Sequence, residues 1–200
     1  HCVTGVQTCA LPICAKTLRR SLIPSLLEGR AKNWASASLH ADLFEIAHLY
    51  IPNEGEDALP SEQYSLAMIT GKDYFSLKGI LEALCIRLGV EATLDVTPID
   101  RSGFAKRGCV ELRLEDELAG YLGLVDKKVL KSWKLSDAVC AAEISLDVLL
   151  KHTRLVPQQA AISMFPSVQR DLNFVVAENV AWREMERVVQ NAVEIGRAHV

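Results

Sequence analysis

Residues Met164–Val176 read MFPSVQRDLNFVV, and this stretch divides the chain in two. Pro166 restricts its own backbone and that of the preceding residue and cannot donate to a sheet, so a new element should begin after it. From Val168 onward apolar and polar residues alternate, which is the period of a β-strand. One side of the predicted strand is mostly apolar and can be buried: Val168, Arg170, Leu172, Phe174 and Val176.

A turn and an amphipathic helix are predicted after this strand. Ala177–Asn179 form a short, mostly polar segment. Beyond it, Met185, Val188, Val189 and Ala192 recur at the spacing of one helix face. We therefore expect a second domain over residues 157–193, which opens as strand, turn and helix.

The same residues carry a family resemblance. The pattern F-P-x-V-x-R-D-L-x-F-V-V resembles the opening strand of the anticodon-binding domain that ends the β subunit of bacterial phenylalanyl-tRNA synthetase (phenylalanine–tRNA ligase). Upstream segments resemble the same subunit in the same order: Leu18–Leu27, Leu43–Ala47 and Asp73–Gly79. The resemblance covers residues 15–193.

Residues 15–156 predict an α+β fold, an antiparallel sheet with flanking helices. The clearest helix is Asp73–Leu88, where Asp73 is a good N-cap. Glu115–Glu117 form the turn of a hairpin, and Gly120 and Gly123 in its second arm suggest close backbone approach. Further helices are expected from Ser21 to Trp34 and from Asp147, and strands at residues 43–51, 63–70, 92–97, 109–114, 118–125 and 139–146.

Two further expectations concern the start of this domain. Leu43–Ile51 is apolar nearly throughout, which favours a strand covered on both faces. Arg19 and Arg20 precede the first helix, and we favour a solvated entry over an interface for this pair.

The two ends of the chain have a different origin in our interpretation. Residues 1–14 have no periodicity and resemble translated sequencing adapter; a secretory signal is the alternative, which the absence of a basic start and the presence of Pro12 disfavour. The codons CAG ACG TGT GCT CTT CCG ATC encode Gln7–Ile13, and their reverse complement, read after GA, encodes Glu194–Val200. We therefore treat residues 1–14 and 194–200 as artefacts.

Composition and charge exclude several classes of protein. The 22 basic and 25 acidic residues give a net charge of -3, so a contact with nucleic acid must come from a local patch or a partner chain. No apolar run reaches the roughly 20 residues of a membrane span. The cysteines of the body, Cys85, Cys109 and Cys140, fit no metal motif and indicate a reducing compartment, with the cytoplasm as the default.

The resemblance implies that residues 15–156 are a class II synthetase catalytic-like domain without activity. The family's active pattern places an arginine two residues before a glutamate and another after a glycine-rich strand. Leu43 stands two residues before Glu45, and Glu143–Asp147 contains neither glycine nor arginine. We therefore expect no catalytic, cofactor-binding or metal-binding residue; ATP and magnesium belong to the whole enzyme, and Glu115–Glu117 is favoured as a solvated turn over a metal site.

The resemblance also implies the partners: the α subunit of phenylalanyl-tRNA synthetase in an α2β2 assembly, and the phenylalanine tRNA. Residues 157–193 would begin a ferredoxin-like anticodon-binding domain. Arg170 is the candidate tRNA-binding residue, with a structural pair or cap at the strand start as the equal alternative. Trp182 is expected to pack the helix instead of stacking on a base. The alternative function is a free-standing class II synthetase-like enzyme or small-molecule-binding protein.

Overall fold

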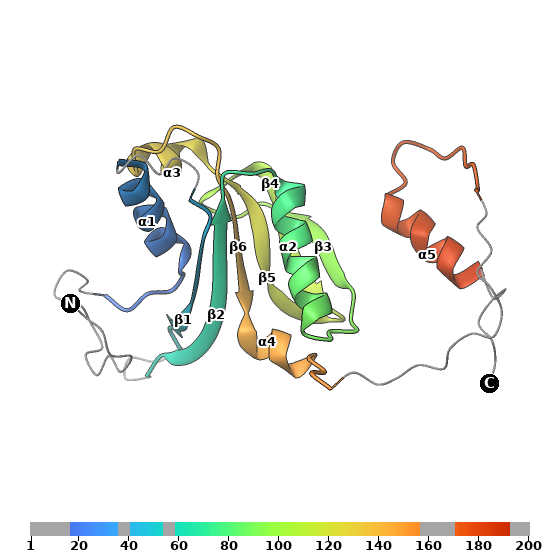
Figure 1. The fold of residues 1–200 in the computed structure, drawn as a ribbon, viewed down its shortest axis with the longest axis horizontal. Helices are drawn as coiled ribbons and strands as arrows, with labels where there is room; N and C mark the ends of the chain where they lie inside the picture. Colours follow the sequence, from blue (N-terminus) through green and yellow to red (C-terminus); the bar gives the residue numbers. More distant parts are fainter. Residues whose placement is uncertain (1–16, 36–40, 54–58, 157–170, 193–200) are drawn as a thin grey trace. The chain divides into compact units, whose positions relative to one another are not determined.

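The computed structural model describes residues 17–35, 41–53, 59–156 and 171–192. The chain forms two compact units, His1–Val156 and Pro157–Val200, which are described separately (Figure 1). None of the helices in the described ranges is long and apolar enough to cross a membrane.

A six-stranded antiparallel sheet forms the first unit, in the order β1-β2-β6-β5-β4-β3. The strands are β1 (Leu43–Ile51), β2 (Ser61–Thr70), β3 (Leu94–Ile99), β4 (Phe104–Leu114), β5 (Glu117–Val125) and β6 (Cys140–Ser145). The helices are α1 (Ile23–Ala35), α2 (Tyr74–Arg87), α3 (Lys127–Ser132) and α4 (Leu146–Lys151). This arrangement confirms the predicted antiparallel α+β fold.

Successive residues of the strands point to opposite faces of the sheet, so the core has two layers. Leu66 belongs to a cluster with the buried residues of α2 and α4, whereas the next residue, Ala67, belongs to a cluster with α1 and α3. The sheet therefore lies between two helical layers.

Short-range signals explain most of the element boundaries. Asp73 caps α2 as predicted, since its side chain accepts the Ser76 N–H at 2.7 Å.

Gly120 and Gly123 of β5 allow the predicted close approach of neighbouring strands. A Cβ on Gly120 would lie 2.1 Å from the backbone oxygen of Glu143, and a Cβ on Gly123 would lie 2.5 Å from that of Gly108.

The structure differs from the sequence-based expectations in three strands and one helix. β2 begins two residues before the predicted 63–70, and β3 lies two residues after the predicted 92–97, both within the usual error of a boundary. β4 begins five residues before the predicted 109–114, and the register of its pairing with β5 shifts between Phe104 and Cys109. The short helix α3 was not predicted at all, because six residues are too few to display a helical period.

The expectation that β1 is covered on both faces is wrong for the chain by itself. Phe44 and Ile46 are 70% and 54% exposed. β1 is the edge strand of the sheet, and the residues packed with α2 come from other strands. Apolar composition therefore indicated a strand but not what covers it.

The second unit contains one helix, α5 (Trp182–Ala192), within its described residues 171–192. The helix agrees with the predicted amphipathic segment. Residues 171–176 are not in a strand, which corrects the expectation for this part of the predicted element. A strand requires a paired neighbour, and the described residues of this unit provide none.

Candidate functional site

A cleft of about 220 Å³ lies on the α1 side of the sheet. Residues of all six strands line it, and its walls are both charged and apolar. Its polar lining comprises Arg20, Gln63, Ser65, Arg101, Glu111, Tyr121, Glu143 and Ser145. This is the concave surface on which a substrate site could be built, so the state of its polar groups decides what it can do.

Glu143 of β6 lines this cleft and is only 4% exposed. Its Oε1 accepts the backbone N–H of Leu22 at 2.6 Å, which ties the start of α1 to the sheet. Its Oε2 accepts a hydrogen bond from the Tyr121 hydroxyl on β5. Both carboxylate oxygens are therefore engaged by groups of the chain.

Tyr121 is held as a neutral donor. Burial of the phenol and, second, the negative charge of Glu143 raise its pKa to about 12. The ring lies beneath the guanidinium of Arg101, whose Cζ is 3.6 Å from the ring centroid, and Phe104 meets it edge-on at 5.5 Å. A tyrosine in this state binds Glu143 and does not act as a base at neutral pH.

Arg19 connects the segment before α1 to β1. Its Nη1 pairs with Glu45 Oε1 at 2.6 Å, and its Nε donates to the His48 carbonyl at 3.0 Å. Arg20 is exposed and Arg19 is partly exposed within the chain, so the choice between a solvated entry and an interface stays a prediction. Glu45, two residues after Leu43, has Arg19 as its partner.

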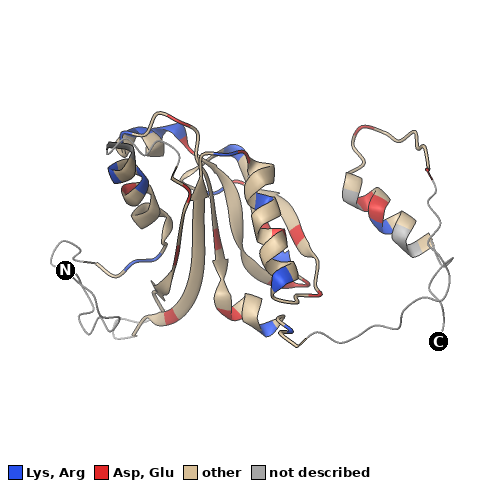
Figure 2. Cartoon of the chain, viewed as in Figure 1, with Lys and Arg blue, Asp and Glu red and all other residues tan. Residues whose placement is uncertain are grey.

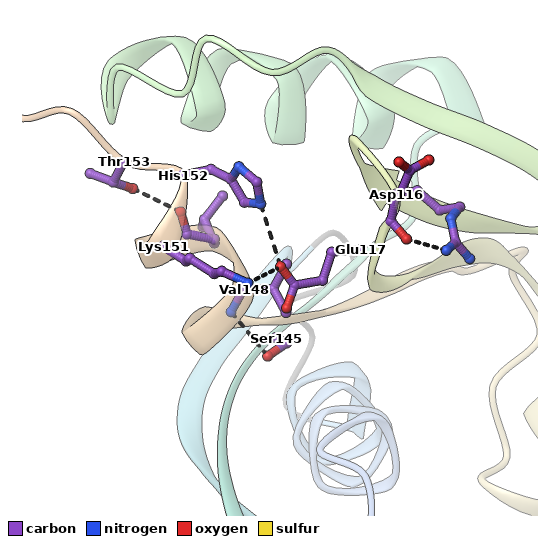
Figure 3. A network of polar contacts seen from close by, with 9 residues as sticks. Asp116, Glu117, Ser145, Val148, Lys151, His152 and Thr153 are labelled. Carbon is purple, nitrogen blue, oxygen red and sulfur yellow. Dashed lines mark hydrogen bonds and ion pairs between the residues drawn. The ribbon is translucent and has the colours of Figure 1, made fainter.

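Glu117, the last residue of the acidic turn, forms ion pairs with the end of α4 (Figure 3). Glu117 Oε2 lies 2.7 Å from Lys151 Nζ and 3.6 Å from His152 Nε2. The hydrogen bond from Lys151 is the main cause that lowers the pKa of Glu117. Among the described residues, no group of three His, Cys, Asp or Glu side chains could hold a metal ion.

An exposed apolar strip lies along the edge of the sheet. The side chains of Phe44 and Ile46 on β1 and of Tyr64 on β2 are exposed to solvent. The ring of Tyr64 lies against that of His48, with the two centroids 3.8 Å apart. We call Phe44, Ile46 and Tyr64 the edge strip. Contiguous exposed apolar residues of this kind are typical of a surface that another protein covers.

In the second unit, Phe174 and Val176 line a hollow of about 250 Å³ together with residues of α5 that include Val188. Arg170 lies outside the described residues. Trp182 at the start of α5 is 72% exposed, so the expectation that it packs the helix is wrong within this unit.

The comparisons with known proteins agree with these observations. The family model described as "Phenylalanyl tRNA synthetase beta chain CLM domain" matches residues 13–146. The chain belongs to this family. The chain is 56% identical, over 189 residues, to the phenylalanine–tRNA ligase β subunit of Rhodopirellula baltica, covering 90% of the chain and 28% of that relative. The β subunit of Clostridium tetani is 31% identical over 87% of the chain and 22% of its own length.

The chain therefore spans about a quarter of the length of these β-chain relatives. Among solved structures, PylSc of Desulfitobacterium hafniense, a pyrrolysyl tRNA synthetase, is similar with a TM-score of 0.54 and 16% identity, over 66% of this chain and 47% of that one. At this identity the similarity concerns the fold alone, and it agrees with the synthetase-type fold expected for residues 15–156.

The sequence analysis considered the carboxylates of Glu115–Glu117, favoured as a solvated turn, but did not consider the carboxylate of Glu143 as a contact residue. Glu115–Glu117 attracted attention because three acids are adjacent, whereas the buried Glu143 carries hydrogen bonds within the cleft. One signal was available: Glu143 is the single charged residue in the otherwise uncharged strand CAAEIS. A charge in such a strand must find donors inside the fold.

Proposed function

We propose that this chain is a non-catalytic part of the β subunit of a phenylalanine–tRNA ligase. In this proposal it supports the ATP-dependent attachment of phenylalanine to its tRNA through assembly with the catalytic α subunit and through positioning of the tRNA. ATP and magnesium act elsewhere in the enzyme, and the assembly works in the cytoplasm as an α2β2 tetramer.

The observation that carries the proposal is the occupied carboxylate of Glu143 in the cleft. Glu143 accepts from Leu22 and Tyr121, and Arg101 lies on the ring of Tyr121. These contacts stabilise the junction of α1 with the sheet, so the polar groups at this position hold the fold together. A structural role for the sheet face follows from them.

The edge strip supports assembly with the α subunit. Phe44 and Ile46 stand on the edge strand, where a partner can both cover apolar side chains and extend the sheet. Burying two such side chains stabilises a complex by about 3 kcal/mol or more in transfer free energy, before the costs of association.

For residues 157–193 we propose the beginning of a ferredoxin-like anticodon-binding domain. Arg170 would contact the tRNA, and the apolar hollow beside α5 would be covered by the rest of that domain. The exposure of Phe174, Val176 and Val188 supports a unit that needs further elements to bury its apolar side.

The test uses a complete β subunit that carries this segment, co-expressed with its α subunit. We expect the double variant F44D/I46D to lose co-purification with α and, with it, aminoacylation. The matched control I86D places a carboxylate at an exposed isoleucine of α2 and should leave assembly intact. Assembly that survives F44D/I46D would refute the docking surface.

The alternative of a free-standing enzyme is tested with residues 15–193 alone. Phenylalanine-dependent exchange of pyrophosphate into ATP by this fragment would contradict the non-catalytic role. The non-catalytic role predicts that the fragment alone shows no exchange, whereas the complete complex of α and β aminoacylates tRNA.

A further inference from the structure

A cluster of lysines covers α3 and the residue pair that follows it. Lys127, Lys128, Lys131 and Lys134 are all exposed, and residues 127–134 contain no acidic residue. Figure 2 shows blue gathered along this helix. We call these four residues the lysine patch. It stands out because the chain as a whole has a net charge of -3.

No carboxylate of the described residues pairs with the lysine patch, although lysines elsewhere have partners. Lys78 pairs with Glu82 and Lys151 with Glu117. The two acidic residues that flank the patch have other contacts. Asp126 accepts the backbone N–H of Lys128 as the cap of α3, and Asp137 pairs with the buried Arg30 at 2.6 Å. The positive charge of the patch is therefore not neutralised within this part of the chain.

The patch borders a hollow of about 640 Å³. Lys127, Lys131 and Lys134 all line it, together with apolar residues such as Leu130 and Leu135 and with Asp137, whose carboxylate pairs with Arg30. Lys127 and Lys131 are four positions apart on one helix, so they share a face and lie about 6 Å apart along its axis. Several cations thus face one concave surface.

Lys134 has a backbone conformation that glycine adopts more easily. Its φ is +58°, and it follows α3 at the position where the N–H of Leu135 donates to the Leu130 carbonyl at 3.0 Å. This is a Schellman-type helix end, at which glycine is the usual residue. A residue with a side chain costs more free energy than glycine in the left-handed region, so a lysine at position 134 lowers the stability of the fold. In return, its ammonium group adds a fourth positive charge to the patch.

We propose that the lysine patch binds the phosphate backbone of tRNA. The inference rests on the proposed function, because that function supplies tRNA as the polyanion in the assembly. Lysine ammonium groups neutralise phosphates as point charges, and each contact releases counterions. Because phosphate contacts carry no base identity, the patch positions the tRNA and does not select it. Anticodon recognition remains with the second unit, so the two surfaces act separately.

The test compares two double variants of the α-plus-β complex that remove the same charge. K127A/K131A removes half of the patch, whereas the control K72A/K106A removes two exposed lysines elsewhere: Lys72, which precedes α2 and lies 3.8 Å from Asp42, and Lys106 of β4. Binding of an in vitro transcribed phenylalanine tRNA and of an unrelated tRNA is measured at several salt concentrations. For K127A/K131A we expect weaker binding of both tRNAs and a plot of log K against log salt that is shallower by about 2, one for each lysine. The control should keep the parental slope.

The variant K134G separates function from folding. Glycine relieves the left-handed backbone, so the thermal midpoint should stay or rise while the affinity for tRNA falls. A misfolded variant would show both properties falling together. Loss of affinity with undiminished stability is the result that only a binding role explains.

Three results distinguish the inference from the proposed function. If K127A/K131A binds tRNA with the same affinity and salt slope as the control, the inference is overturned. The proposed function is unaffected by this result as long as the complex still aminoacylates. Loss of α-subunit assembly in K127A/K131A, with unchanged tRNA affinity of the remaining complex, would overturn it in favour of an acidic protein partner. An unmodified complex that does not aminoacylate would overturn the proposed function and the inference with it.

Discussion

Replacing Glu143 by alanine should destabilise the first unit through the loss of two hydrogen bonds. The carboxylate accepts the N–H of Leu22 at 2.6 Å and the hydroxyl of Tyr121, and Leu22 is fully buried. Each buried donor left without an acceptor costs about 1–3 kcal/mol, so the free energy of unfolding should fall by about 4 kcal/mol. That is a large fraction of the roughly 5–15 kcal/mol by which a domain is stable.

Glu143→Gln provides the matched comparison. The amide oxygen can still accept from Leu22, and the Tyr121 hydroxyl can turn to accept from the amide group. Only the charge is lost, and burying a neutral side chain also costs less than burying a carboxylate. We expect Glu143→Gln to lose about 1 kcal/mol, since hydrogen bonds to charged groups exceed neutral ones by about that amount.

Urea denaturation followed by circular dichroism measures both variants, and an unchanged m-value would show that the same surface unfolds. Hydrogen exchange at the Leu22 amide adds a local reading of the start of α1. Glu111→Ala is the control on the same sheet face, because its partner Arg113 is partly exposed and the pair should contribute no more than about 1 kcal/mol. The reasoning fails if Glu143→Ala loses less than about 1 kcal/mol, or if alanine and glutamine are equivalent.

Three further predictions follow from single positions. Gly120→Ala should lower the free energy of unfolding by about 3 kcal/mol or more, because the new Cβ would lie 2.1 Å from a backbone oxygen of β6. Gly79→Ala has no atom within 4 Å of the new Cβ and should stabilise α2 by about 0.5–1 kcal/mol. Urea denaturation of the two variants checks both signs. The raised pKa of Tyr121, about 12 against 10 when unfolded, means that the folded state keeps a proton that the unfolded state loses. Stability is therefore fully present below pH 10 and should fall by about 1.4 kcal/mol per pH unit from pH 10 to 12, a slope absent from Tyr121→Phe in the same pH series. Asp137→Ala should cost about 3–5 kcal/mol by thermal or urea unfolding, because Arg30, 1% exposed, loses its carboxylate partner; equal stability of the variant would contradict this.

Local signals account for what the sequence predicted well. Asp73 starts α2 because its side chain needs only the N–H three residues away, and the hairpin of β4 and β5 needs only a short turn. Both features can be recognised within a window of a few residues. The antiparallel α+β class followed from such local elements taken in order.

Long-range contacts account for what it did not predict. Leu22 and Glu143 are 121 residues apart, and Arg30 and Asp137 are 107 apart. The sequence could have indicated that a lone carboxylate in the strand CAAEIS needs donors, but not which residues provide them. The exposed side of β1 has the same origin, because burial depends on the neighbour in space. In the second unit, residues 171–176 of the predicted strand have no pairing neighbour among the described residues.

The buried thiol groups can report local opening of the elements that carry them. Cys85 on α2, Cys109 on β4 and Cys140 on β6 are buried and unpaired, and burial raises the pKa of each thiol. A chain trimmed to residues 15–193 contains no other cysteine. A thiol reagent can then reach the protein only when one of these elements detaches, since the reactive thiolate is both rare and covered. The labelling rates of the three positions would rank the helix and the two strands by how often each opens, without any engineered probe.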